Sequence, residues 1–371
     1  MAALISGLSP ESLRSADQTF RKLEPDEERW RDRQQFLESR GYMLRPRYRP
    51  GWIPSWTGTR RNPVFCEDSK ALPARPHLID ATRISDDKMV YVKRVQSGDN
   101  ESRIATMLSS ETLLKDPRNK CVPIVDLFED SDDPTISYMV MPFLRLVNDP
   151  PFAIVDDVAD FVEQMLEGLV FLHEVGVAHR DCSYKNVMMD ASAMYPHGFH
   201  PAKDTFLPDG ETPAKPLARS SVSIIYYYVD FGISVHIPPD VDPKLAVGDD
   251  GRDREPPELS SDAPYNPFKL DIFLIGNLFR RVVHDEYFNV EFLSTVIDPM
   301  TREDPASRPD ARDILECWRK VRTSLSLYKR RWELRSRTET RNTFFLDMVC
   351  FVRVTIYAVR QLFGWAVGTK R

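Results

Sequence analysis

The feature of this chain that most constrains its fold is the order of its hydrophobic patterns. Short β-favouring runs come first, and long helical patterns follow. The runs 78–84 and 89–95 flank the turn residues Ser-Asp-Asp-Lys, which predicts a β-hairpin. Helical spacing over 100–114 and two more β-like runs, 122–128 and 136–143, come next. The first part is therefore predicted to be strand, strand, helix, strand, strand.

The pattern changes to helical after Asn148-Asp149-Pro150-Pro151. Residues 158–174 place their apolar side chains on one helical face, and 270–283 and 311–325 are further strong helical candidates. A small β-rich part followed by a larger helical part predicts an α+β fold of two lobes. We expect residues 42–145 to form the N-lobe and 146–327 to form the C-lobe.

The predicted lobes are flanked by extensions at both ends. Residues 1–41 are predicted as a helical extension, because Pro25 suits the first turn of a helix and Gly41 ends it. Trp30 and Leu37 give that helix one narrow apolar stripe. Residues 42–59 are rich in Pro, Arg and aromatic side chains, so we expect an extended segment that wraps another surface. Residues 328–371 form a basic and apolar tail.

Composition and charge narrow the functional classes. A hydrophobic fraction of 42% with 11% aromatic residues is that of a globular protein. From Lys329 to the end, ten Lys and Arg face three acids, so the rest of a chain of net charge −6 is strongly acidic. An acidic body argues against nucleic acid as a partner. The five cysteines are scattered and never form CxxC, which favours a reducing, cytoplasmic location over a disulfide framework or a zinc site.

Four short motifs occur in a fixed order: Val90-Tyr91-Val92-Lys93, His179-Arg180-Asp181-Cys182-Ser183-Tyr184-Lys185-Asn186, Asp230-Phe231-Gly232 and Pro256-Pro257-Glu258. At these residues the chain resembles the eukaryotic protein kinase superfamily, whose signatures are VAIK, HRDxxxxN, DFG and APE. The resemblance covers about residues 78–325. The HRDC sequence and the long insert after it are similar to kinase-like proteins of mushroom-forming fungi.

The resemblance implies an ATP- and Mg²⁺-dependent transfer of a phosphoryl group to a protein substrate, on a bilobal protein-kinase-like fold. Phosphoryl transfer needs positioning and charge neutralisation, and Mg²⁺ prefers oxygen ligands, which Asp and Asn side chains supply. The implied site residues are Asp181 as catalytic base, with Lys185, Arg180 and His179 in the same loop; Lys93 paired with Glu101, with Met141 and Phe143, for the nucleotide; and Asn186 and Asp230 for the metal.

The chain departs from the kinase pattern in two places. No glycine occurs between Gly58 and Gly98, so the Gly-rich loop is absent from its expected place and ATP would meet fewer backbone donors. Ser183 stands where serine/threonine kinases carry a lysine, and Lys185 is either its substitute or an exposed loop lysine. A pseudokinase acting as a nucleotide- or protein-binding scaffold is therefore the alternative function. A small-molecule phosphotransferase is a third hypothesis.

Two further matches concern the helical lobe. Asp271 and Gly276 resemble the DxxxxG of the helix that anchors the catalytic loop. Arg308 resembles the arginine that pairs with the APE glutamate, here Glu258, although an exposed helix-start cation is the alternative. Between Asp230 and Glu258 the only side-chain hydroxyl is Ser234, so we expect that phosphorylation of this segment is not a switch.

The composition of the insert and of the tail indicates the character of each. Residues 191–223 contain five prolines and are predicted to be a surface loop, in which His197 and His200 are structural rather than metal ligands. In the tail, residues 344–367 have a wide apolar face, but Arg353 near the centre argues against a membrane span. Peripheral membrane contact through an interfacial helix and packing on the protein body both remain open, as does the oligomeric state.

Overall fold

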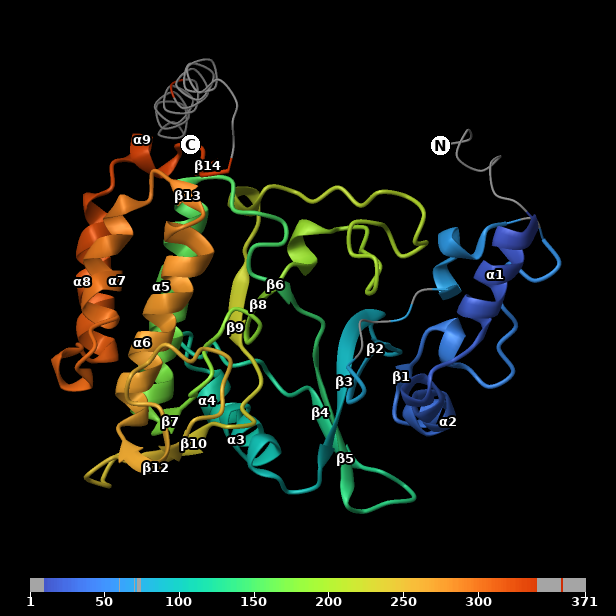
Figure 1. The fold of residues 1–371 in the computed structure, drawn as a ribbon, viewed down its shortest axis with the longest axis horizontal. Coiled ribbons are helices and arrows are strands. Elements are labelled where there is room, and N and C mark those ends of the chain that lie inside the picture. The colour runs from blue at the N-terminus through green and yellow to red at the C-terminus, as the bar shows by residue number, and fades with distance from the viewer. Residues whose placement is uncertain (1–9, 60, 70, 72–74, 339–354, 356–371) are drawn as a thin grey trace, which may run out of the picture. The chain divides into compact units, whose positions relative to one another are not determined.

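The chain forms two compact units (Figure 1). The computed structural model describes residues 10–59, 61–69, 71, 75–338 and 355. Unit 1 contains the described residues within 1–106, 122–144 and 190–217, and unit 2 contains the remaining described residues. The change of unit after 144 lies near the predicted lobe boundary, but the structure also assigns 190–217 to unit 1 and 107–121 to unit 2.

Unit 1 is built on a five-stranded antiparallel sheet with the order β1-β2-β3-β5-β4. The strands are β1 (Tyr42–Met43), β2 (Leu78–Arg83), β3 (Lys88–Gln96), β4 (Asp126–Glu129) and β5 (Ile136–Pro142). The predicted hairpin is thus present. The predicted helix 100–114 is instead two helices, α3 (Asn100–Leu108) and α4 (Glu111–Leu114), and the Asn119 side-chain amide donates to carbonyl oxygens near their C-terminal ends, those of Leu108 and Leu113.

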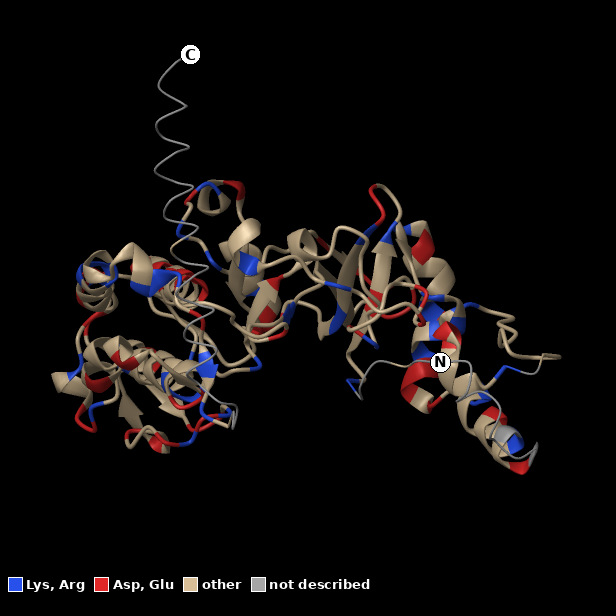
Figure 2. Cartoon of the chain, turned by 90° about the horizontal axis from the view of Figure 1, so that it is seen from above, with Lys and Arg blue, Asp and Glu red and all other residues tan. Residues whose placement is uncertain are grey.

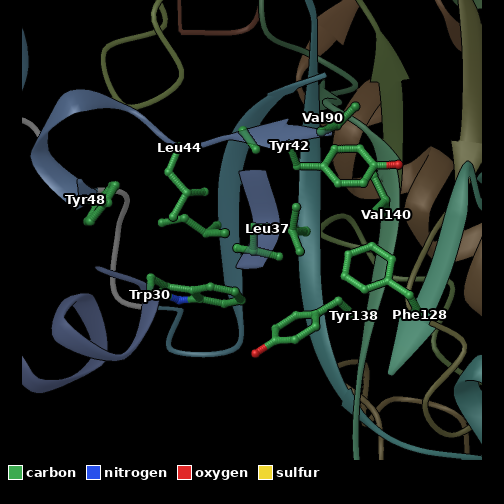
Figure 3. Close-up of a cluster of buried hydrophobic side chains, with 12 residues drawn as sticks. Trp30, Leu37, Tyr42, Leu44, Tyr48, Val90, Phe128, Tyr138 and Val140 are labelled. Carbon is green, nitrogen blue, oxygen red and sulfur yellow. The ribbon is translucent and has the colours of Figure 1, made fainter. Parts of the chain in front are cut away.

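One face of this sheet is covered by helix α2 (Pro25–Ser39), which follows α1 (Pro10–Arg21). Trp30 and Leu37 of α2 are buried together with Val90 and Val140 of the sheet, as Figure 3 shows. The helix begins at Pro25, and Gly41 follows its end with φ of +92°, as expected. The predicted apolar stripe is therefore part of the core of unit 1.

The segment after α2 contacts its neighbours through arginines. It contains three 3₁₀ turns, Pro46–Tyr48, Pro63–Phe65 and Glu67–Ser69. Arg47 is buried and donates to both carboxylate oxygens of Glu27 in α2, at 2.6 and 2.9 Å. Arg45 donates to both oxygens of the buried Asp80 on β2, at 2.7 and 3.1 Å. This segment therefore joins α2 to β2.

The insert is only in part the surface loop that its prolines predict: most of residues 211–223 are exposed, whereas the first part of the insert has buried side chains. Met194, Tyr195, Phe199 and His200 are buried in unit 1. The His200 ring nitrogen Nε2 lies 3.1 Å from the Glu67 carboxylate, and its Nδ1 accepts the Ala202 backbone N–H. Apolar and aromatic side chains between the prolines give this segment a buried side, which outweighs its loop-like composition.

Unit 2 is largely helical, with helices α5 (Val155–Glu174), α6 (Pro267–Phe279), α7 (Ser294–Met300), α8 (Ala311–Ser324) and α9 (Leu327–Arg330), and a π-helical turn at Arg280–His284. The predicted helices 158–174, 270–283 and 311–325 correspond to α5, α6 with the π-helical turn, and α8. The strands are short: β6 (Arg145–Leu146), β7 (Val177–Ala178), β8 (Val187–Asp190), β9 (Ile225–Tyr228), β10 (Val235–His236), β11 (Ala246–Gly248), β12 (Ser260–Tyr265), β13 (Tyr287–Phe288) and β14 (Arg335–Ser336). The α+β organisation predicted from the sequence is observed.

Neither sign of charge is confined to one part of the described chain. Figure 2 shows basic and acidic residues interspersed along the described chain. Of the tail, β14 pairs with β13, whereas residues 344–354 and 356–367, most of the segment for which a membrane-surface helix is one hypothesis, lie outside the described residues. Among the helices that the structure describes, none has the length and apolar character needed to cross a membrane. The described cysteines Cys66, Cys121, Cys182 and Cys317 are free thiols.

Candidate active site

Lys93 and Glu101 form an ion pair within unit 1. Lys93 lies on β3 and Glu101 in the first turn of α3, and Nζ and Oε1 are 2.5 Å apart. Their side chains are only 13% and 11% exposed. Helix α3 begins at this point because the Asp99 carboxylate accepts a hydrogen bond from the Ser102 backbone N–H, as an N-cap residue does. The pairing expected from the sequence is therefore formed.

Aromatic side chains lie beside this pair. Tyr91 shares a face of β3 with Lys93, because side chains two residues apart on a strand point to the same side. Its ring stacks on Phe143 with a centroid distance of 4.2 Å and an interplanar angle of 23°. Met141 is the register partner of Tyr91 on β5. The two residues predicted to contact the nucleotide, Met141 and Phe143, thus neighbour a residue that the sequence analysis did not single out. Tyr91 stands where the VAIK signature has alanine. The large side chain at this position was the sequence signal that could have indicated its contact with Phe143.

The insert adds another aromatic ring to this group. Phe199 packs edge-to-face on Phe143 at 5.6 Å, and Tyr195 packs edge-to-face on Phe199 at 5.0 Å. Edge-to-face and offset-stacked pairs are the favourable arrangements of aromatic rings. Tyr91, Phe143, Phe199 and Tyr195 therefore form a continuous aromatic row, which connects the strand that carries Lys93 to the insert.

The connection between β1 and β2 differs from a short glycine-rich hairpin. Residues 44–77 join the two strands, and their glycines, Gly51 and Gly58, precede β2 by 20 residues or more. Unit 1 also contains a cavity of about 870 Å³, whose lining includes Arg45, Asp80 and Phe199. Lys93 and Glu101 do not line this cavity, so it is separate from the pair predicted to bind phosphate.

In unit 2 the loop predicted to be catalytic is held on α6 by Asp271. The fully buried carboxylate accepts the backbone N–H of His179 at 2.8 Å and that of Arg180 at 2.7 Å. The ring nitrogen Nε2 of His173 lies 3.1 Å from the same carboxylate. Burial raises the pKa of the neighbouring Cys182 thiol well above its ordinary value, so this cysteine stays protonated. The anchoring role predicted for Asp271 is confirmed.

Asp181 is held from two sides. The Asn186 side-chain Nδ2 donates to Asp181 Oδ2 at 2.7 Å and to the Asp181 carbonyl oxygen at 3.1 Å. The Arg252 backbone N–H donates to Asp181 Oδ1 at 3.0 Å. Because Asn186 uses its NH₂ group here, its amide oxygen is the atom that can bind a cation. The predicted base and one predicted metal ligand are therefore adjacent.

The Asp230-Phe231-Gly232 segment packs against the same loop. Phe231 is buried with its ring 5.0 Å from the His179 ring, and His179 Nε2 lies 3.1 Å from the Val229 carbonyl oxygen. Asp230 is exposed and has φ of +66°, in the left-handed region that non-glycine residues adopt at a cost of roughly 1–3 kcal/mol. His179 thus has a structural contact with this motif, which sequence reasoning did not specify.

Arg180 binds the segment that follows Asp230-Phe231-Gly232 in the sequence. Its Nη1 donates to the Ile233 carbonyl oxygen at 3.0 Å, and its Nη2 donates to the Val247 carbonyl oxygen at 2.8 Å. Nη2 also lies 2.8 Å from the Tyr265 hydroxyl oxygen. Arg180 therefore acts as a structural bridge here, whereas Lys185 is exposed and its role stays a prediction.

Glu258 and Arg308 form a buried ion pair. Arg308 Nη1 contacts Glu258 Oε1, and Nη2 donates to Glu258 Oε2 at 2.9 Å. The Arg308 side chain has no exposed surface. The pairing predicted for these residues is confirmed, and the alternative of an exposed cation at a helix start is wrong.

Metal ligation would rest on few protein groups. Among the described residues no group of three or more His, Cys, Asp and Glu side chains is gathered as a metal-binding cluster. Mg²⁺ bound with a nucleotide typically takes one or two carboxylate ligands and completes its shell with phosphate and water oxygens. The hard oxygens of Asn186 and Asp230, both in unit 2, fit this requirement. His200, predicted to be structural rather than a metal ligand, contacts Glu67.

Comparison with known proteins identifies one curated relative. A stretch of 117 residues is 30% identical to the serine/threonine-protein kinase chk1 of Schizosaccharomyces pombe, covering 30% of this chain and 24% of that protein. The chain thus matches about a quarter of that relative's length. No family model matches the chain. Among solved structures, one titled as the Rad53 kinase domain and SCD2 in complex with AMPPNP has 15% identity and a TM-score of 0.38, covering 67% of this chain and 89% of that one.

The partial identity to a kinase agrees with the ordered motifs, two of which are fastened as the resemblance implies: the catalytic loop by Asp271 and the APE glutamate by Arg308. The finer resemblance to kinase-like proteins of mushroom-forming fungi stays a prediction. The chain is similar, over part of its length, to a serine/threonine protein kinase, which supports its resemblance to the protein kinase superfamily.

Proposed function

We propose that this chain is an ATP-dependent protein kinase that transfers the γ-phosphoryl group to a hydroxyl group of a protein substrate. The observation that carries the proposal is the arrangement of Asp181 and Asn186 in a loop anchored by Asp271. A carboxylate held by two hydrogen bonds, with an amide oxygen next to it, is suited to accept a proton beside a bound cation.

The proposed roles follow from the chemistry of each group. Asp181 accepts the proton of the substrate hydroxyl while the new O–P bond forms and the bond to the departing ADP breaks. Magnesium–ATP, when bound, supplies the transferred group and neutralises its charge. The oxygens of Asn186 and Asp230 hold the metal. Lys93, oriented by Glu101, binds the α- and β-phosphates, and the exposed Lys185 is available for the γ-phosphate.

A second candidate function, a pseudokinase scaffold, is favoured by one observation. The Tyr91 ring, stacked on Phe143, lies on the strand face that carries Lys93. A phenol at this position takes space that an alanine methyl would leave to a flat base. Under this hypothesis Tyr91→Ala would create or strengthen nucleotide binding. Under the kinase hypothesis the same change leaves the dissociation constant of ATP within a few-fold of the wild-type value or weakens binding by loss of stacking.

Phosphoryl transfer from radiolabelled ATP to a mixture of protein acceptors tests the proposal. Asp181→Asn is expected to lower kcat by roughly 10²- to 10⁴-fold, the range for loss of a general base. Asp230→Asn should abolish the magnesium dependence of ATP binding. Asp313→Asn, a change of an exposed aspartate on α8, is the matched control and should leave both unchanged. Activity that survives both site substitutions would refute the assignment.

Two binding measurements separate the hypotheses. Magnesium–ATP is expected to raise the melting temperature of the wild-type chain, and Lys93→Met should reduce that rise. No rise for the wild-type chain together with a rise for Tyr91→Ala would favour the scaffold. Transfer to a small alcohol or amino sugar, with none to any protein, would favour a small-molecule phosphotransferase.

A further inference from the structure

The segment between Gly232 and Glu258 has no accessible side-chain hydroxyl. Ser234, its only hydroxyl residue, is buried, and its Oγ donates to the His179 carbonyl oxygen at 3.0 Å. A phosphate therefore has no exposed attachment point on a side-chain hydroxyl of this segment. Since the segment is nevertheless ordered next to Asp181, other groups must hold it.

Two acids of the segment are bound by three residues at the end of α6 and in the π-helical turn. Asn277 Nδ2 donates at 2.9 Å both to Asp253 Oδ2 and to Glu255 Oε2. Arg281 Nη2 donates to Glu255 Oε1 at 2.5 Å and to Asp253 Oδ1 at 3.2 Å, and Arg280 contacts Glu255 Oε2. We call Asp253, Glu255, Asn277, Arg280 and Arg281 the acid clamp.

The buried part of the acid clamp has no other evident task. The Asp253 side chain is only 4% exposed, and Asn277 is fully buried. The Asn277 amide oxygen has no hydrogen-bond partner, so this side chain acts only as a donor to the two carboxylates. The Arg281 guanidinium and then Arg280 hold the pKa of Glu255 below its ordinary value, so the carboxylate is ionised at neutral pH.

The acid clamp is covalently next to the contact on the predicted base. Asp253 follows Arg252, whose backbone N–H donates to Asp181 Oδ1. Gly251, with φ of +121°, allows this approach, because a Cβ at that position would lie 3.3 Å from the Arg180 carbonyl oxygen. Displacement of Asp253 would therefore move the amide that orients Asp181.

The other side of the segment is held by Arg180. Its guanidinium donates to carbonyl oxygens at the start and in the middle of the segment, those of Ile233, Val247 and Gly248. These neutral acceptors occupy the donors that an anionic group would otherwise use. Arg180 and the acid clamp thus hold the segment at both ends through groups of the unmodified chain.

We propose that Asp253 and Glu255 are positioning residues, which keep the Arg252 amide on the Asp181 carboxylate without any phosphate on the segment. In assigning a catalytic consequence to this contact, the proposal rests on the proposed kinase function. Loss of the clamp is expected to lower kcat through a less ordered base, whereas the Michaelis constant for ATP should change little because the clamp does not include the predicted nucleotide-binding residues.

Hydrogen–deuterium exchange of the full-length chain tests the positioning directly, without ATP. The double variant Asp253→Asn with Glu255→Gln should increase amide exchange over residues 246–258 by about tenfold or more, since it removes the charge-assisted hydrogen bonds that hold this segment on α6 and the π-helical turn. Asp250→Asn, an exposed aspartate of the same segment, is the control and should exchange like the wild type. Arg281→Lys should restore part of the protection that Arg281→Ala loses.

The outcomes distinguish the two proposals. Unchanged exchange in the double variant, or a phosphatase-treated wild-type chain with faster exchange over 246–258, would overturn the positioning role. Faster exchange with kcat and the Michaelis constant both unaltered in an active enzyme would overturn its link to catalysis. A wild-type chain without any transfer activity would refute the kinase function, while the exchange data would still decide whether the clamp orders the segment. Asp253→Asn alone serves if the double variant does not fold.

Discussion

The buried pair of Arg308 and Glu258 allows a quantitative prediction of stability. The Arg308 guanidinium donates to both oxygens of Glu258 and also to the carbonyl oxygens of Lys269, Arg302 and Glu303. Arg308→Met keeps the approximate length of the side chain and removes every one of these bonds. It leaves the Glu258 side chain, only 8% exposed, with an uncompensated charge.

The expected cost is about 3–5 kcal/mol, the usual result of removing one partner of a buried ion pair. This is a large part of the roughly 5–15 kcal/mol by which a domain is stable. Replacing both partners, as in Arg308→Met with Glu258→Leu, should cost clearly less than the single change, because no charge is then left buried. Arg308→Lys should fall between wild type and Arg308→Met, since an ammonium keeps the charge but not the fork geometry.

Urea unfolding measures these differences in stability. The unfolding is monitored by the hydrogen-exchange protection of amides in α6 and α8, so that unit 2 is observed separately. With an m-value near 2 kcal/mol/M, a loss of about 4 kcal/mol lowers the midpoint by about 2 M. A loss below about 1 kcal/mol for Arg308→Met, or a double variant at least as unstable as the single one, would show that the burial of this charge pair has been misjudged.

Three other predictions concern single positions. Leu37→Ala, at a fully buried site on α2, should destabilise unit 1 by about 2–5 kcal/mol in urea unfolding, and a loss under 0.5 kcal/mol would contradict the packing of α2 on the sheet. Asp271→Asn places an NH₂ group against a backbone N–H and should lower kcat by about tenfold to a hundredfold with the fold retained by circular dichroism; unchanged kcat would remove its anchoring role. Because the folded-state pKa of Glu255 is lowered, its stabilisation is present above its unfolded value of about 4.3 and is lost as pH falls through the folded value. The stability difference between wild type and Glu255→Gln should therefore shrink on acidification, and a difference constant from pH 7 to pH 3 would contradict the ion pairing.

Local sequence signals predicted those parts of the molecule that local forces determine. The strand of Lys93 and the helix of Glu101 were predictable from periodicity, whereas their pairing was implied only by the resemblance. The pair of Arg308 and Glu258 was predictable only through the resemblance, since 50 positions separate the two residues. The acid clamp gave no sequence signal, because acids and arginines are common on surfaces and only the tertiary fold brings Asp253 to a buried position beside Asn277 of α6.

The insert shows a different limit. Its five prolines predicted an exposed loop, and composition alone could not reveal that Phe199 and His200 would find partners in Phe143 and Glu67. Those partners are more than 50 positions away in the sequence, so their meeting depends on the tertiary fold. Tyr91 is a simpler case, because the substitution of alanine by tyrosine beside Lys93 was visible in the motif itself.

The packing of α2 has a practical consequence for any shortened form of this protein. A chain that begins at Leu78, where the kinase-like motifs start, would leave Val90, Val92, Tyr138 and Val140 open to water. An uncovered apolar sheet face of this kind promotes self-association. Recombinant work on the motif-bearing region should therefore retain residues 25–48, or supply them as a separate peptide, to keep the protein in solution.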